Sequence, residues 1–266
     1  MLRYLRLLGA LARYGLAREL AFRGNFIAKI TVELLWLGIL LIFYRTVFAR
    51  TSAVGGWTES EYLFFVGCFF AMEGLLETFC LSNCNEFADL VRSGDLDFLL
   101  LKPIDEQFLV TLRSLDWSTV PNVFLGTGVM VFALRDMGWT FDPVRLGLFL
   151  LMLVCGLALA YSFLLLLTAS SVWMVRNQSL YEMWWLVTNF MRYPREIFKG
   201  PWGAPLGWFF TFVVPVMLVV SVPADTMVRA LRPGVAAFTL AATGVMLVVS
   251  RAVFRLALRR YRSASS

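Results

Sequence analysis

The feature that most constrains this chain is a series of apolar runs, each long enough to cross a lipid bilayer. The longest of them, residues 146–175, contains no charged side chain. A helix needs about 20 apolar residues to cross the hydrocarbon core. Hydrophobic residues make up 59% of the 266 positions and charged residues only 16%. The sequence therefore predicts an all-α polytopic membrane protein.

Six spans are predicted, at about residues 25–48, 59–82, 108–134, 142–175, 178–192 and 234–254. Pro121 lacks a backbone donor and should kink the third span. Both ends of the chain are rich in arginine, with five between Arg3 and Arg23 and five between Arg251 and Arg262. The excess of positive charge on cytoplasmic flanks predicts that both termini are cytoplasmic, which requires an even number of spans. Trp57, Trp139 and Trp202 then fall at the external interface.

These spans divide one transmembrane domain, residues 1–266, into seven parts. They are an N-terminal segment (1–24), spans one and two (25–82), a soluble loop (83–107), spans three to five (108–192), a proline-rich stretch (193–233), the last span (234–256) and a basic tail (257–266). In the first part, Arg3, Arg6 and Arg13 share one face of a helix and leucines lie opposite. This pattern predicts an amphipathic helix in the cytoplasmic interface; the alternative is an ordinary basic flank of span one.

The loop at residues 83–107 is acidic, with six carboxylates against two basic side chains. Within it, Ser93 or Gly94 can cap a short helix that carries two aspartates in its first turn, leucines on one face and a terminating Lys-Pro pair. The residues are Gly94, Asp95, Leu96, Asp97, Leu99, Leu100, Lys102 and Pro103. Such a helix can dock into a groove on a soluble partner, or lie on the headgroups. If it docks, Leu96→Asp or Leu99→Asp should uncouple the partner without unfolding the spans.

Ionisable residues inside spans are costly and mark pathways or structural pairs. Six are candidates for a translocation path: Glu33, Glu73, Glu77, Arg113, Asp116 and Glu182. Glu77 and Arg113 should lie at similar depth on adjacent spans, so they can simply neutralise each other. Glu73 has no evident partner, which makes it the better candidate for a role in transport.

The stretch 193–233 contains six of the nine prolines and yet is apolar between Leu206 and Val222. Two short half-helices dipping back from the outer face would satisfy both features. A full span at residues 204–223, with residues 183–199 on the cytoplasmic face, remains the alternative. The residues that characterise the re-entrant motif are Arg192, Tyr193, Pro194, Pro215 and Pro223.

Several function classes are excluded by what the sequence lacks. It has no histidine, no G-x-x-x-x-G-K-[ST] phosphate loop and no G-x-S-x-G motif, so we expect no nucleotide hydrolysis, no metal site and no enzyme activity in this chain. The four cysteines lie in or beside apolar runs and are expected to be packing residues. The net charge of +6 is concentrated at the ends, which indicates membrane orientation and no nucleic-acid partner.

Two motifs resemble the membrane subunits of ABC-2 type transporters, in the bacterial branch of uncharacterised permeases of about this length. The first is SGDLDFLLLKPIDEQFL at residues 93–109, which is similar to a G-x-L-x-x-x-L-L-x-P signature after span two. The second is MRYPREIFKGPWGAPLGWFFTFVVPVMLVVSVPA at residues 191–224, with an R-Y-P stretch followed by a proline-bounded apolar run. The likeness extends over nearly the whole chain.

The resemblance implies a permease subunit in a bacterial inner membrane, paired with an identical or sister permease above two separate ABC ATPase subunits. ATP and Mg²⁺ would bind those ATPases, and this chain would hold no cofactor. Residues 94–101 would be the coupling helix, residues 1–23 the interfacial helix and the proline-rich stretch an external re-entrant pair. Export is the commoner direction. The alternatives are a membrane scaffold that recruits a soluble partner through the 83–107 loop, and an ion-coupled secondary transporter.

Overall fold

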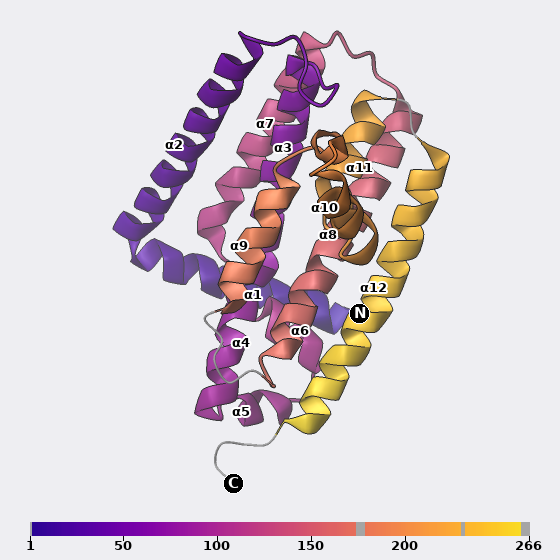
Figure 1. Cartoon of the computed structure of the whole chain (residues 1–266). Helices are drawn as coiled ribbons and strands as arrows, with labels where there is room; N and C mark the ends of the chain where they lie inside the picture. Colours follow the sequence, from indigo (N-terminus) through magenta and orange to yellow (C-terminus); the bar gives the residue numbers. More distant parts are fainter. Residues whose placement is uncertain (1, 174–178, 230–231, 262–266) are drawn as a thin grey trace.

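The computed structural model describes residues 2–173, 179–229 and 232–261, and within them the chain forms a bundle of helices (Figure 1). Five of these segments are long and apolar enough to cross a membrane: α2 (Arg23–Phe48), the continuous helix Glu59–Ser93, Trp117–Asp136, α8 (Pro143–Ser170) and α12 (Pro233–Arg260). A sixth candidate is a bent pair of helices, Ala204–Val213 and Met217–Val228. The prediction of an all-α polytopic membrane protein is confirmed.

The predicted fifth span is shorter than expected. Its helix, α9 (Ser179–Met191), has 13 residues, fewer than the roughly 20 that cross a bilayer. The predicted start at Gln178 lies outside the described residues. After α9 the chain continues through a short 3-10 turn, η3 (Arg195–Lys199).

The two ends of the bundle differ in what they carry (Figure 1). We call the end with α1 (Leu2–Ala21), α4 (Ser82–Ser93), α5 (Leu96–Leu100) and α6 (Glu106–Leu112) the α1 end. The opposite end, with the turn between α2 and α3 (Glu59–Leu76), is the Trp57 end. In Figure 1, α1 lies across the bundle while α2 runs along it. The arginines at 3, 6 and 13 of α1 are exposed, as expected for an interfacial helix.

Contacts with the third span hold α1 in place. The Trp117 indole donates to the Ala12 carbonyl at 2.9 Å, and the Tyr4 hydroxyl accepts from the backbone N–H of Asp105 at 3.2 Å. Gly15 allows the closest approach, because a Cβ there would lie 2.8 Å from the Leu115 carbonyl oxygen. The segment 1–24 therefore packs on the protein as well as carrying an arginine-rich face.

The second span is longer than predicted. α3 continues through a π-helical turn, η1 (Glu77–Leu81), into α4, so the helix runs eleven residues beyond the predicted end at Ser82. The sequence of α4 explains this extension, since Cys84, Phe87 and Ala88 are buried on one face while Glu86 and Asp89 are exposed. The helix ends at Gly94, which adopts the left-handed conformation (φ 80°) that glycine accepts without strain. The first part of the predicted 83–107 loop is therefore helical.

The third span breaks earlier than predicted. α6 ends at Leu112, a 3-10 turn η2 (Trp117–Thr119) follows, and α7 (Val120–Asp136) begins with Pro121 in its first turn. Pro121 starts a helix, where its missing donor costs nothing, and does not kink one. The break at residues 113–116 is stabilised by the Asn83 side chain, which donates to the Thr111 and Ser114 carbonyls and accepts from the Ser114 N–H and hydroxyl.

Small residues allow α3 and α7 to cross closely. A Cβ on Gly126 would lie 2.5 Å from the Ala71 nitrogen and 2.5 Å from the Gly67 carbonyl oxygen. Helix association in membranes depends on such small residues, because lipid gives no hydrophobic drive for helices to pair. α8 is packed in the same way against α11 (Met217–Val228), where a Cβ on Gly156 would lie 2.3 Å from the Val219 carbonyl oxygen.

The bent pair turns back on itself, as a re-entrant segment would. α10 (Ala204–Trp208) and the π-turn η4 (Phe209–Val213) meet α11 at an angle of 92°. The pair follows η3, whose Glu196 bonds to Trp57, and α11 ends at Arg229, which bonds to the Gly56 carbonyl. Both ends therefore lie at the Trp57 end, which favours the re-entrant arrangement over a full span at 204–223. Pro215 lies at the bend, whereas Pro223 lies inside the buried helix α11.

Candidate functional site

The predicted coupling helix forms, but its apolar face points inward. α5 begins at Leu96, and Asp95 precedes it as the N-cap residue, in place of the predicted cap at Ser93 or Gly94. Leu96 and Leu99 are 0% and 8% exposed. They belong to a small apolar cluster at the α1 end whose buried members are Phe87, Leu96, Leu99, Val110, Leu165, Ala169, Phe254 and Ala257. The burial of these two leucines argues against their docking on a partner, which stays a prediction.

The apolar side chains that α5 presents outward are different ones. Phe98 is 69% exposed and Leu101 is 81% exposed. Lys102 and Pro103 follow in the exposed turn, and Leu100 is partly buried. A Leu96→Asp substitution would thus place a charge in the protein interior, where it unfolds the segment, rather than on a docking surface.

The turn after α5 is tied to the long helices. Asp105 caps α6 by accepting from the Phe108 N–H at 3.1 Å, and it accepts from Arg251 of α12 at 2.8 Å. Burial opposes ionisation, but the Arg251 guanidinium and the backbone donors outweigh it and hold the pKa of Asp105 below its ordinary value. Arg251 also donates to Gln107, which donates to the Tyr161 hydroxyl of α8. The start of α6 is therefore bonded to both α8 and α12.

The predicted Glu77–Arg113 pair does not form. Arg113 is paired with Glu86 of α4. Asp116 lies 3.4 Å from the ammonium of Lys29 and caps η2 by accepting from the Ser118 N–H. Glu182 is exposed on α9 and lines neither of the two cavities described next.

Four of the predicted carboxylates line two adjoining cavities between α2, the α3–α4 helix, the start of α7 and α9. A cavity of about 220 Å³ is lined by Glu33, Glu73, Glu77 and Arg192. A cavity of about 470 Å³ lies nearer the α1 end and is lined by Lys29, Glu33, Glu77, Asn85 and Asp116 among others. The two share part of their wall: Val32, Glu33, Glu77 and Leu81.

Helical spacing explains why these groups converge. Glu73 and Glu77 are four residues apart and therefore share one face of the α3–η1 helix. The π-turn that starts at Glu77 widens the helix, and the Thr78 carbonyl accepts from the backbone N–H of Asp116 at 3.0 Å. Inserted π-turns of this kind are frequent at functional sites. The π-turn η1 therefore positions the residues around Asp116 beside the cavity wall.

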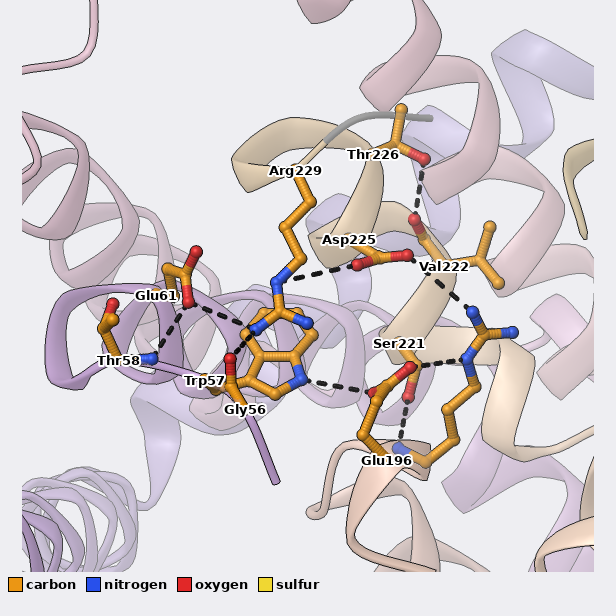
Figure 2. A network of polar contacts seen from close by, with 11 residues as sticks. Gly56, Trp57, Thr58, Glu61, Glu196, Ser221, Val222, Asp225, Thr226 and Arg229 are labelled. Atoms are coloured by element: carbon orange, nitrogen blue, oxygen red, sulfur yellow. Dashed lines mark hydrogen bonds and ion pairs between the residues drawn. The ribbon is translucent and has the colours of Figure 1, made fainter. Parts of the chain in front are cut away.

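The Trp57 end is closed by a polar network centred on Arg229 (Figure 2). The Arg229 guanidinium donates to the Gly56 carbonyl at 2.6 Å and to Glu61 at 3.2 Å, and it lies 4.1 Å from the centre of the Trp57 ring. Glu61 also accepts from the backbone N–H of Thr58, completing the cap of α3. One side chain thus joins the end of α11 to the α2–α3 turn and to the start of α3.

The network continues to η3 (Figure 2). The Trp57 indole donates to Glu196 at 3.2 Å, and Glu196 accepts from Arg195 at 3.0 Å. Arg195 lies 3.7 Å from Asp225 of α11. Trp57 is 0% exposed, so its predicted place in an aromatic belt is wrong, whereas Trp202 is 93% exposed.

The motif at residues 191–224, which begins with the R-Y-P stretch, flanks this network. Arg192 faces the smaller cavity from the end of α9, its guanidinium 5.4 Å from the Trp36 ring centre and 5.5 Å from that of Phe69. Tyr193 is exposed, and Pro194 is the buried residue that precedes η3. The R-Y-P stretch therefore marks the point where the chain passes from the cavity to the polar network.

Comparison with protein families decides the assignment. The profile described as ABC-2 family transporter protein matches residues 34–265. The chain belongs to the ABC-2 transporter family. No curated protein and no solved structure matches it. It is thus a multi-pass membrane permease of an ABC transporter and a non-enzymatic component of it.

Sequence reasoning missed several residues of this ABC-2 permease. Asn122 is a polar residue inside the predicted third span, and that position alone would have singled it out. Asn83 gave no such signal, because it was predicted to begin the 83–107 loop, whereas the structure buries it. Arg229 and Glu61 gave no signal, because their pairing depends on the re-entrant fold. The expected absence of a metal site stays a prediction, although within the described ranges no group of three or more His, Cys, Asp and Glu side chains is placed to hold a metal ion.

Proposed function

We propose that the chain is one of two permease subunits of an ABC exporter in a bacterial cytoplasmic membrane, driven by separate ATPase subunits, with both termini in the cytoplasm. The observation that carries the direction is the asymmetry of the molecule. The cavities lie toward the α1 end, where the arginine-rich termini would face the cytoplasm. The Trp57 end is closed by the Arg229 network. A substrate would therefore enter from the cytoplasm or the inner leaflet.

The ATPase contact in this proposal is the exposed edge of α5. Phe98 and Leu101 are the large apolar side chains that α5 and its last turn expose, and an exposed apolar side chain at a helical knob fits a groove in a soluble partner. The tether from Asp105 to Arg251 would carry movement of α5 into α12. ATP binding and hydrolysis in the partner would thus bias the helices around the cavity.

The test is co-purification of the tagged chain in mild detergent from its native membrane, with ATPase turnover and its sensitivity to vanadate as the readouts. We expect a stoichiometric soluble ATPase. The double substitution Phe98→Asp and Leu101→Asp should reduce the amount of ATPase that co-purifies by roughly tenfold or more. The reason is that docking would bury the two aspartates and strip them of their hydration, which costs free energy. Membrane level and size-exclusion profile of the permease should not change.

Leu96→Asp is the matched control, since the same charge enters the same helix on its buried side. We expect it to lower the amount of folded permease itself. Full ATPase recovery with the Phe98 and Leu101 double variant would refute the docking surface. No ATPase with the wild-type chain, under conditions that keep another ABC complex intact, would overturn the transporter and favour a membrane scaffold.

A further inference from the structure

We propose that the two adjoining cavities form one binding site for an organic cation with an apolar body. This inference rests on the proposed function and names the substrate class that the permease would carry. It follows from three properties of the cavity walls: unpaired carboxylates, indole rings and a buried acceptor with no partner.

The carboxylates of the site form no close ion pair within the described residues, although Arg192 acts on Glu73 and Glu77 from a longer distance. Among the described residues, no basic group lies within 4 Å of Glu33, Glu73 or Glu77, and no side-chain hydrogen bond to them is present, although Asp116 and Glu86 nearby are both paired. Carboxylates inside a membrane protein usually face a partner or a wet cavity, because an isolated charge there is costly. Three such groups on one cavity wall therefore favour a positively charged occupant.

A fourth acceptor points the same way. Asn122 lines the smaller cavity, is 3% exposed, and its side-chain oxygen Oδ1 has no hydrogen-bond partner in the described structure. Buried amide oxygens are almost always bonded, so this one is free to accept from a donor that enters the cavity. An ammonium or other N–H donor in the cavity would bond to it. Arg192 Nε, on the same wall, is a buried donor that also has no partner in the described structure.

Arg192 is the basic group on the wall of the smaller cavity, and its positive charge opposes the binding of a cation there. Its guanidinium is held against the rings of Trp36 and Phe69. Together the described walls carry four carboxylates, from Glu33, Glu73, Glu77 and Asp116, against two basic groups, Lys29 and Arg192. On the described walls the carboxyl groups therefore outnumber the basic groups by two to one.

The rest of the wall selects an organic cation over a metal ion. Trp36, Trp184 and Trp185 line the smaller cavity, and indole faces attract cations that carry apolar groups. A metal ion would need several oxygen ligands converging within about 2.6 Å of it. The carboxylates are too dispersed for that, since no cluster of metal-ligating side chains occurs in the described residues.

The experiment is equilibrium binding to the purified full-length chain in nanodiscs, with tetraphenylphosphonium as the probe. Tetraphenylborate is the matched control ligand, because it has the same shape and the opposite charge. We expect saturable binding of the cation and none of the anion. The double substitution Glu73→Gln and Glu77→Gln should weaken binding of the cation by roughly tenfold or more. Glu106→Gln, which removes one exposed carboxylate outside the cavity, should leave it unchanged.

Equal binding of the anion would overturn the proposal and show an apolar pocket without charge selection. Unchanged affinity in a folded Glu73 and Glu77 double variant would place the cation elsewhere and also overturn it. The comparison of the two ligands on the wild-type chain keeps the test valid if that variant does not fold. Co-purification of the ATPase is scored separately. No cation binding with the ATPase still present would refute the substrate class and leave the permease assignment intact.

Discussion

Arg229 joins three segments that are far apart in the sequence: the α2–α3 turn, the start of α3 and the end of α11. Its partners are partly buried, with the Glu61 side chain 20% exposed and that of Asp225 13% exposed. Removing one partner of such a network leaves the remaining buried polar and charged groups without hydrogen bonds or counter-charges. The resulting loss of folding free energy exceeds what the pair itself contributes. The closure of the Trp57 end therefore depends on this side chain.

Arg229→Ala is expected to destabilise the permease by roughly 2–3 kcal/mol, because it unpairs Glu61 and the Gly56 carbonyl. The measurement is thermal unfolding of the purified chain in detergent. Fluorescence of the buried Trp57 should also shift to the red as water reaches the Trp57 end. Arg50→Ala is the control, an exposed arginine near the same turn that forms no ion pair within the described residues. An unchanged transition with Arg229→Ala would contradict the network.

At the residue scale, the sequence identified which side chains are unusual but not which of them meet. Glu33, Glu73 and Glu77 were predicted as path candidates, and they do line the cavities. The partner of Arg113 was predicted as Glu77 and is Glu86. Depth along a span can be counted from the sequence, but the rotation of one helix against the next is set by packing. The predicted ion pair between spans, Glu77 with Arg113, was therefore wrong.

At the element scale, the joint between α6 and η2 depends on one amide. Asn83 is 2% exposed, and its side chain makes bonds to the carbonyls of Phe79, Thr111 and Ser114 and to the N–H of Ser114. These bonds satisfy backbone groups that the break in the third span leaves without helical partners. The broken helix is stable inside the bundle because of them.

Asn83→Leu should therefore cost roughly 3 kcal/mol or more, since each buried backbone group that loses its partner costs about 1–3 kcal/mol. Urea or thermal unfolding of the solubilised chain would measure it. Asn189→Leu is the matched control, because Asn189 is only partly buried and, among the described residues, its side chain bonds to the Trp185 carbonyl of its own helix alone. A stable Asn83→Leu variant would mean that water or a rearranged backbone satisfies the break.

The elements themselves were predictable where apolarity decides them. The spans around α2, α3, α8 and α12 lie close to their predicted places, and the bent pair follows from prolines within an apolar run. The failures are at junctions. α4 extends span two beyond Ser82, and the third span breaks before Pro121. Each junction is stabilised by long-range contacts, such as those of Asn83 and Gly15, that local patterns do not contain.

At the scale of the whole molecule, the orientation proposed above can be tested by thiol labelling. All four cysteines are buried, so the wild-type chain should react little with a membrane-impermeant maleimide. In intact cells we expect Trp202→Cys, at a 93% exposed position, to be labelled from outside. Phe98→Cys, at a 69% exposed position, should be labelled only after the membrane is opened. The reverse pattern would invert the topology and with it the direction of the proposed transport.

By itself the sequence determined that this chain is a helical membrane protein and where the spans around α2, α3, α8 and α12 lie. The physical reason is that lipid requires about 20 apolar residues per crossing and internally bonded backbone, and both requirements can be read along the chain. Only the tertiary structure decided which face of α5 is free, which carboxylates share a cavity and how the Trp57 end is closed. Those depend on helix rotation and crossing, which side-chain packing between distant segments sets.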